Sequence, residues 1–238
     1  MDRQELKRQL ELLSTSLSHE DSILLKARVE ALSSVYPFNE YEYIISFLID
    51  RGALSFSEYE RLRERYISSN RYLELFELSP RVFGQVWAEK HLQDLDHRFQ
   101  KPNKDIDPDY DGEYDLWFEG IKVEVKASRA IHARNRGALI TRALHWDDQA
   151  PFWMNFQQLK LDTCDVFVFI GVWVDKLVYW VLSTQDIIQE PSLSHQHRGG
   201  VEYQIGITDK NITEFEQYQV KPDQIGQIIL QKFAKKSR

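Results

Sequence analysis

Residues 114–126 read Tyr-Asp-Leu-Trp-Phe-Glu-Gly-Ile-Lys-Val-Glu-Val-Lys, and this stretch decides the fold of the second half of the chain. The pair Glu119-Gly120 is typical of a two-residue turn between antiparallel strands. Counting outward from that turn, Asp115 pairs with Glu124. Residues paired in this way point to the same face of a sheet, with Cβ atoms about 5 Å apart. The stretch therefore predicts a β-hairpin with two facing carboxylates.

The face that carries these carboxylates also carries a lysine. Side chains alternate along a strand, so Lys126 lies on the same side as Glu124. Two opposed carboxylates repel each other; Lys126 compensates part of this repulsion, and a divalent cation would compensate more. Carboxylate oxygens favour Mg²⁺, and the carbonyl of Val125 is a further candidate ligand. Lys126 would then orient a metal-bound water, or help to deprotonate it, for attack on phosphorus. The structural alternative is a surface hairpin with Lys–Glu pairing.

Beyond the hairpin, the sequence predicts an α/β fold, a mixed central β-sheet flanked by helices. Residues 164–174 form a nearly continuous apolar run, typical of a central buried strand. Residues 176–182 are its expected antiparallel partner, and residues 201–208 a further strand. Helices are expected at 152–160, 184–190 and 222–234.

The first third of the chain has helical spacing of its apolar residues. We expect helices at 2–17, 20–34, 39–50 and 57–67. Gly52 separates the last two, which favours either a helix-turn-helix or plain helical packing. We therefore divide the chain into a helical region, residues 1–78, for DNA contact or dimerisation, and a core, residues 79–238.

A further helix should begin at Ser79-Pro80, because serine caps helices and proline suits the first helical position. It is expected to end at about Leu95. Val82, Val86 and Glu89 then fall on one stripe. A carboxylate on an apolar stripe either reaches solvent at its edge or faces a metal centre.

A basic segment follows Lys126. No acidic residue occurs from Ala127 to His145, although the chain has a net charge of −7. Arginines there would bind phosphates or read guanine edges, unless they form a solvated loop. The loop at His195 to Arg198 would enter a DNA groove, or is simply exposed. The candidate DNA-binding residues are Arg129, His132, Arg134, Arg136, Arg142, His195, His197 and Arg198.

The order of these elements resembles the PD-(D/E)xK nuclease superfamily, which includes type II restriction endonucleases. The elements are a helix with a glutamate, a Pro-Asp segment, an aspartate that opens a strand, and Glu-x-Lys on the next strand. The resemblance covers about residues 80–182. It implies a restriction-endonuclease-like core in which Asp115 and Glu124 bind Mg²⁺, with Mn²⁺ as a substitute. It also implies that Lys126 acts on the attacking water and that Glu89 assists.

The literal Pro-Asp of the chain is Pro108-Asp109, whereas the acid in strand register is Asp115. We favour Asp115 on geometry, with Asp109 and Asp111 as alternatives. The resulting hypothesis is a Mg²⁺-dependent, sequence-specific endonuclease that cuts double-stranded DNA as a homodimer. The resemblance alone implies a cognate DNA methyltransferase as a partner. The alternatives are a repair or junction nuclease with the same centre and a non-catalytic DNA-binding module.

The composition agrees with a globular protein and favours the cytoplasm. Hydrophobic residues make up 42% of the chain and charged residues 28%. The single cysteine, Cys164, excludes a disulfide framework. The charged start of the chain lacks the apolar segment of a secretory signal.

Overall fold

The computed structural model describes residues 3–31, 35–195 and 202–236. The chain divides into two units, Met1–Ser68 and Ser69–Arg238. The division precedes the predicted one between residues 78 and 79. The short helix η1 (Leu73–Phe76) belongs to the second unit, where the Tyr72 N–H donates to the Val174 carbonyl at 2.9 Å. In the described ranges, no helix combines the length and apolar character needed to cross a membrane.

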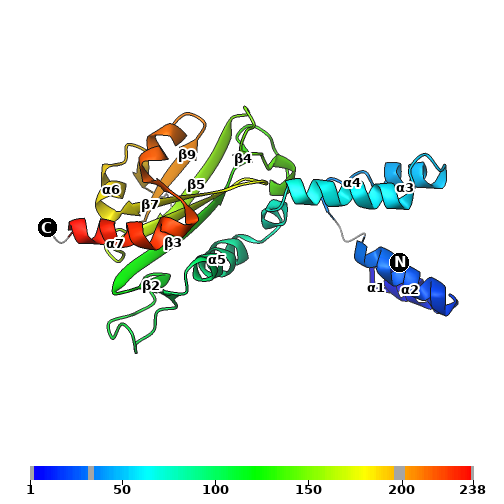
Figure 1. The fold of residues 1–238 in the computed structure, drawn as a ribbon, viewed down its shortest axis with the longest axis horizontal. Coiled ribbons are helices and arrows are strands. Elements are labelled where there is room, and N and C mark those ends of the chain that lie inside the picture. The colour runs from blue at the N-terminus through cyan, green and yellow to red at the C-terminus, as the bar shows by residue number, and fades with distance from the viewer. Residues whose placement is uncertain (1–2, 32–34, 196–201, 237–238) are drawn as a thin grey trace. The chain divides into compact units, whose positions relative to one another are not determined.

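The first unit is helical, which confirms the prediction. Gly52, with a φ of +67°, ends the third helix, a conformation that favours glycine. The Ala53 N–H reaches back to the Leu48 carbonyl at 2.9 Å and closes that end. The helices are α1 (Arg3–Ser14), α2 (His19–Ala31), α3 (Glu42–Asp50) and α4 (Phe56–Ser69) (Figure 1).

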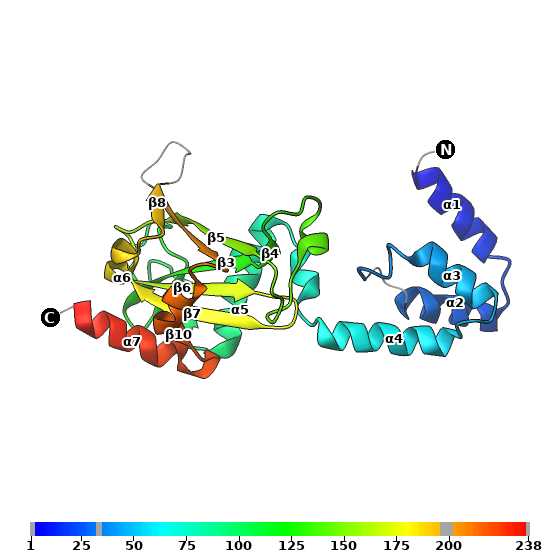
Figure 2. The ribbon, with the colours of Figure 1, turned by 90° about the horizontal axis from the view of Figure 1, so that it is seen from above.

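The second unit is a mixed α/β structure built on two sheets (Figure 2). The larger sheet has the strand order β1-β2-β3-β6-β7-β10, with β3 and β6 parallel and the other neighbours antiparallel. All seven residues of β6 are buried, which confirms the predicted central strand. Its strands are β1 (Phe99–Gln100), β2 (Leu116–Phe118), β3 (Ile121–Arg129), β6 (Val166–Val172), β7 (Leu177–Ser183) and β10 (Gln219–Val220).

The smaller sheet is antiparallel and contains an element that the sequence analysis assigned wrongly. Residues 152–160 were expected to form a helix, but Phe152–Leu159 is strand β5. Phe152, Met154 and Phe156 are buried and alternate with more exposed residues, as in a strand with one face on the core. The sheet has the order β4-β5-β9-β8, with β4 (Ile131–His132), β9 (Tyr203–Thr208) and β8 (Leu193–His195).

The core lies between the two sheets, where the Phe156 ring of β5 stacks on the Phe169 ring of β6 with centroids 4.4 Å apart. Helices α5 (Ala88–Leu95) and α7 (Ile225–Lys236) cover the opposite face of the larger sheet. His91 of α5 hydrogen-bonds Tyr179 of β7 at 2.8 Å. The remaining short helices are α6 (Thr184–Gln189), η3 (Leu139–Arg142), η4 (Ile212–Tyr218) and η5 (Pro222–Gln224), so the predicted helices at 184–190 and 222–234 are confirmed.

The helix that begins near Ser79 ends at Leu95 as predicted, but its buried stripe differs. Val82 is 40% exposed and Val86 is 61% exposed. Residues Val82–Trp87 form a π-helical segment, η2, whose wider turn shifts the phase of the side chains that follow. The buried residues are instead Phe83, Ala88, Glu89 and Leu92. Among the predicted stripe residues, only Glu89 is buried.

Candidate active site

The β2–β3 hairpin has the register that the sequence predicts. Phe118 lies opposite Ile121 and Leu116 opposite Val123; Asp115 lies in a bend just before β2, where its N–H donates to the Val123 carbonyl at 3.2 Å. The two turn residues both have positive φ, +91° at Gly120, as the tight hairpin turn requires. Local chain geometry therefore brings Asp115 beside the part of β3 that carries Glu124.

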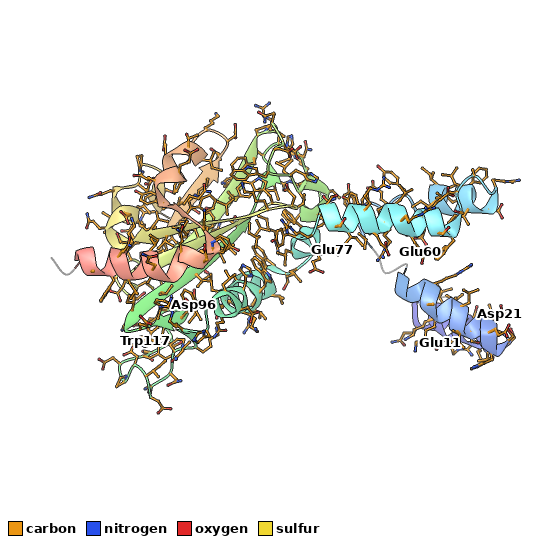
Figure 3. The ribbon with its side chains drawn as sticks, viewed as in Figure 1. Glu11, Asp21, Glu60, Glu77, Asp96 and Trp117 are labelled. Atoms are coloured by element: carbon orange, nitrogen blue, oxygen red, sulfur yellow. The ribbon has the colours of Figure 1, made fainter. Side chains whose placement is uncertain are left out.

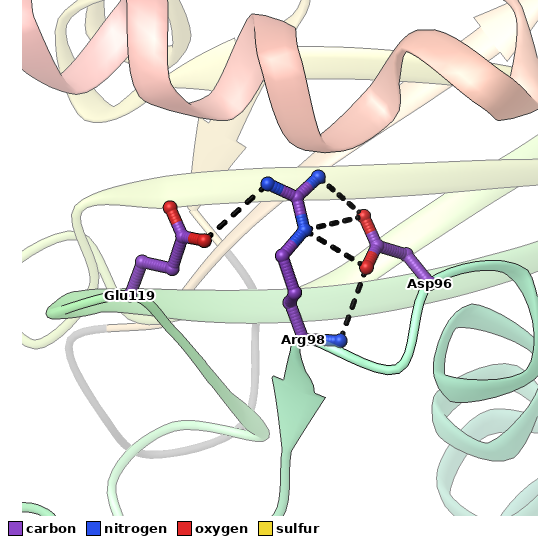
Figure 4. Close-up of polar contacts among 3 residues, drawn as sticks. All are labelled: Asp96, Arg98 and Glu119. Atoms are coloured by element: carbon purple, nitrogen blue, oxygen red, sulfur yellow. Dashed lines mark hydrogen bonds and ion pairs between the residues drawn. The ribbon is translucent and has the colours of Figure 1, made fainter.

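A charged clamp holds the turn of this hairpin. Figure 4 shows Arg98 between Asp96 and Glu119. The Arg98 Nη2 donates to Asp96 Oδ2 at 2.6 Å, and Nη1 donates to Glu119 Oε1 at 3.3 Å. The guanidinium also lies over the Phe118 ring, 4.8 Å from its centroid. Figure 3 labels Asp96, which directly follows α5, and Trp117, which lies in β2.

The candidate catalytic groups are a buried cluster on and beside β3. Glu124 Oε1 and Lys126 Nζ lie 2.5 Å apart, and their side chains are 4% and 19% exposed. Asp115 Oδ2 accepts the Val125 N–H at 2.9 Å. The Cys164 thiol donates to Glu124 Oε2 at 3.4 Å. The charges of Asp115, Glu124 and Lys126 act on one another, so the three side chains lie in one region of the hairpin.

The charges of this cluster set its protonation. Burial raises the pKa of Glu124, Lys126 opposes that rise, and the charge of Asp115 adds to it. Burial alone would lower the pKa of Lys126, but the charges of Glu124 and Asp115 outweigh it, so that this pKa is raised. Lys126 is therefore an ammonium at neutral pH. An ammonium donates hydrogen bonds but accepts no proton, which favours an orienting role over that of a base.

The hairpin cluster opens into a cleft of about 520 Å³. Asp115 and Lys126 lie on one side, and the start of the helix at Pro80 to Gln85 forms the other. Strand β5 supplies a row of amides along the cleft. The lining residues are Pro80, Arg81, Gly84, Gln85, Asp115, Val125, Lys126, Ala127, Asn155, Gln157 and Gln158.

The donor set of the cleft fits a hard divalent cation. Within the described residues, three or more His, Cys, Asp or Glu side chains do not gather around one point. Asp115 and Val125 line the cleft, where Asp115 accepts the Val125 N–H, and the charge of Asp115 acts on Glu124, which does not line the cleft itself. Mg²⁺ commonly uses one or two carboxylates and takes its other oxygens from water and phosphate.

The chain matches no protein-family model and no curated protein sequence. The resemblance to PD-(D/E)xK nucleases therefore rests on the motif and on the arrangement of the elements.

Glu89 is buried as part of α5. It forms an ion pair with Lys101 and does not line the cleft. Asp115 in turn acts on Lys101, because its charge opposes the lowering of the Lys101 pKa by burial. Glu89 is thus linked to the site through Lys101.

The alternative acids of the Pro-Asp loop lie elsewhere. Asp109 and Asp111 are exposed and do not line the cleft. The loop is anchored by Asp107, which accepts the Tyr114 hydroxyl at 2.8 Å and pairs with Lys122 at 3.3 Å. The geometry favours Asp115 over both alternatives.

Three of the candidate DNA-binding residues make contacts within the chain. The Arg129 guanidinium donates to the Leu78 carbonyl at 2.6 Å, and burial lowers its pKa to about 10. Arg142 donates to the His132 carbonyl at 3.1 Å. His132 Nδ1 accepts the Arg134 N–H at 3.2 Å. Arg129, which is 8% exposed, is held as a structural residue in this arrangement.

The other predicted contacts are more accessible. The side chains of Arg134 and Arg136 are exposed in the loop between β4 and η3. His195 is exposed at the end of β8, with its ring 4.6 Å from that of Tyr203. His197 and Arg198 lie outside the described residues. Arg134 and Arg136 therefore remain the strongest candidates for phosphate contact.

Sequence reasoning missed several groups of the cleft. Arg81 lines it from the helix start, where no motif marks it. Cys164 was considered only for its redox chemistry, yet it contacts Glu124. Gln157 and Gln158 also line the cleft, from strand β5 and not from the helix that was expected at 152–160. The alternation of buried residues in β5 was the signal that could have placed them.

Proposed function

We propose that this chain is a Mg²⁺-dependent endonuclease of the PD-(D/E)xK type, which hydrolyses phosphodiester bonds in double-stranded DNA. The observation that carries the proposal is the convergence of Asp115, Glu124 and Lys126 on one hairpin whose turn fixes its register. The same residues adjoin a cleft of about 520 Å³, close in sequence to exposed arginines.

The order of the elements supports this reading. Helix α5 precedes the hairpin, and β6 then runs parallel to β3, so that the Glu-x-Lys strand lies inside a mixed sheet. The resemblance implies such a restriction-endonuclease-like core. The connection from β3 to β6 passes through β4 and β5, which extend the core with a second sheet.

The residues of the site have distinct roles in this proposal. Asp115, Glu124 and the Val125 carbonyl would hold Mg²⁺ or Mn²⁺, which supplies Lewis-acid stabilisation of charge on the phosphate when bound. The Lys126 ammonium orients the attacking water and donates to a phosphate oxygen. Arg134 neutralises backbone phosphates outside the cleft, which makes binding dependent on salt.

The resemblance also implies a class of enzyme, the type II restriction endonucleases. A type II restriction enzyme would cut both strands of a symmetric site as a two-fold homodimer, with a cognate methyltransferase that protects host DNA. The N-terminal helical unit would then serve DNA contact or dimerisation. A repair or junction nuclease would use the same groups on a different DNA structure.

The test is digestion of unmethylated plasmid and phage DNA by the full chain, with Mg²⁺ and with EDTA. We expect discrete fragments with Mg²⁺ and none with EDTA. Lys126→Ala should reduce the cleavage rate by about 100-fold or more, as expected for loss of a positioned catalytic group. Lys122→Ala is the matched control, because Lys122 lies on the same strand but pairs with Asp107 and does not line the cleft. Equal cleavage by wild type and Lys126→Ala would refute the assignment.

One observation favours a second candidate, a non-catalytic DNA-binding module. Glu124 and Lys126 neutralise each other's charge in an ion pair, as they would in a hairpin with a purely structural role. Titration with Mn²⁺ separates the two candidates. A catalytic centre binds the ion through Asp115 and Glu124 and loses it in Asp115→Asn, whereas a structural pair shows no specific binding.

A further inference from the structure

The cleft continues beyond the candidate catalytic groups as a groove. A second cavity of about 390 Å³ adjoins the first and shares part of its lining. Its far end is more apolar and holds Trp153, which is 47% exposed. The residues common to both cavities are Pro80, Gly84, Ala127, Asn155 and Gln157. A single groove therefore runs from Lys126 to Trp153.

One side of this groove is a row of side chains on β5. Trp153, Asn155 and Gln157 point away from the core, because the residues between them are buried. At about 3.3 Å per residue, the row spans roughly 13 Å. Successive base pairs of duplex DNA lie about 3.4 Å apart, so the row matches about four steps.

A bulge in β5 presents an extra amide to the groove. The pairing of β5 with β9 shifts between Phe156 and Leu159, and Gln158 has a φ of +57°. A regular strand would send Gln157 and Gln158 to opposite faces, yet both line the cleft. A non-glycine residue in this conformation is strained by roughly 1–2 kcal/mol, and such strain tends to lie at functional sites.

Gln157 is the amide that is ready to bind a ligand. Its side chain is exposed, and it has no hydrogen-bond partner within the part of the chain that the structure describes. Asn155, by contrast, donates to the Gln204 carbonyl oxygen at 3.1 Å. Gly84 lines the same two cavities as Gln157, and an added Cβ at Gly84 would meet nothing within 4 Å.

We infer that Gln157 reads a base next to the cleaved phosphate, and that this base is adenine. A free carboxamide offers one donor and one acceptor side by side, which matches N7 and the N6 amino group of adenine in the major groove. This inference rests on the proposed function, because it takes duplex DNA as the occupant of the groove. It adds the specificity-determining residue and the base that this residue selects.

The test is selection of protein-bound duplexes from a pool with a randomised centre, in EDTA so that cleavage plays no part. Wild type should enrich a motif with adenine at one position. Gln157→Ala should lose roughly 10- to 100-fold of the discrimination at that position and keep the rest of the motif. Gln149→Ala is the matched control, since Gln149 is an exposed glutamine outside the groove. Gly84→Phe, which fills the groove, should weaken binding to all sequences.

The outcomes separate this inference from the nuclease proposal. An unchanged motif in Gln157→Ala, or a wild type that enriches no motif, overturns the inference even if Mg²⁺-dependent cleavage is found. An adenine motif lost in Gln157→Ala supports it even if no DNA is cut. If Gly84→Phe binds DNA as tightly as wild type, DNA does not occupy the groove, and the inference is overturned as well.

Discussion

Replacement of Lys126 by methionine should destabilise the second unit at neutral pH. Methionine keeps an unbranched apolar stem but removes the ammonium, so that Asp115 and Glu124 lack a compensating charge. Glu124 is 4% exposed at its side chain and has little access to water. The substitution therefore leaves a buried carboxylate with a like charge as its neighbour.

The size of the effect follows from the geometry of the pair. At a separation of 2.5 Å and an effective dielectric constant of about 20, the attraction is about 6–7 kcal/mol. Burial of methionine does not carry the desolvation cost that burial of an ammonium does. The net loss of folding free energy is therefore smaller than this attraction. Buried pairs that lose one partner typically lose about 3 kcal/mol or more. For a unit of this size, that loss lowers Tm by roughly 6–12 °C.

The loss should depend on pH. The pKa of Glu124 in the folded chain lies above its ordinary value of 4.5, and removal of Lys126 raises it further. Below the ordinary value, Glu124 is protonated in both states and the substitution costs least. As pH rises through the raised pKa, the folded variant must ionise a buried acid, so the stability difference from wild type grows.

The measurement is thermal unfolding of both proteins from about pH 4 to pH 8, a range that brackets the titration. Lys122→Met is the control, because Lys122 is 31% exposed and pairs with Asp107 at 3.3 Å. Mg²⁺ should restore part of the stability lost in Lys126→Met, since a cation at the two carboxylates replaces the missing charge. A variant as stable as wild type at neutral pH, or a loss that does not change with pH, would refute this account of the cluster.

Two further substitutions test the packing that holds the site. Gly171→Ala would place a Cβ 2.7 Å from the buried Trp180 ring, so we expect the free energy of unfolding, measured in urea, to fall by roughly 1–3 kcal/mol. Gly206→Ala is the control and should change it little, because the nearest atom there is 3.4 Å away. Ser183→Ala removes the cap of α6, in which the serine accepts the Asp186 N–H at 3.2 Å, and should cost about 1 kcal/mol by the same assay. If Gly171→Ala leaves the free energy of unfolding unchanged, β6 and β7 are packed less tightly than in the structure.

The hairpin could be predicted from sequence because its geometry is local. The turn at Gly120 fixes the register, and alternation along β3 then assigns Glu124 and Lys126 to one face. Neither step needs knowledge of distant contacts. The burial of the cluster, by contrast, depends on β6 and on Cys164, which lies 40 positions along the chain from Glu124.

The second side of the cleft was predicted wrongly because a helix-like spacing competes with the alternation in β5. In β5, Phe152, Phe156 and Leu159 are buried, and these positions have the spacing of a helix face. The bulge at Gln158 creates that spacing by returning Leu159 to the core. In the helix before α5, the π-helical turn shifts the buried stripe in the same unpredictable way.

These irregularities share a location. The bulge at Gln158 and the π-helical residue Gly84 line the same cleft as Lys126, although they come from three separate elements. Strained or irregular backbone persists where the surrounding structure holds it in place, and it gathers at functional sites. A groove with only a structural role gives no reason for a bulge, a π-helical turn and the partly buried Asp115 and Lys126 to meet there. Their coincidence is an argument for the position of the site that does not depend on the sequence motif.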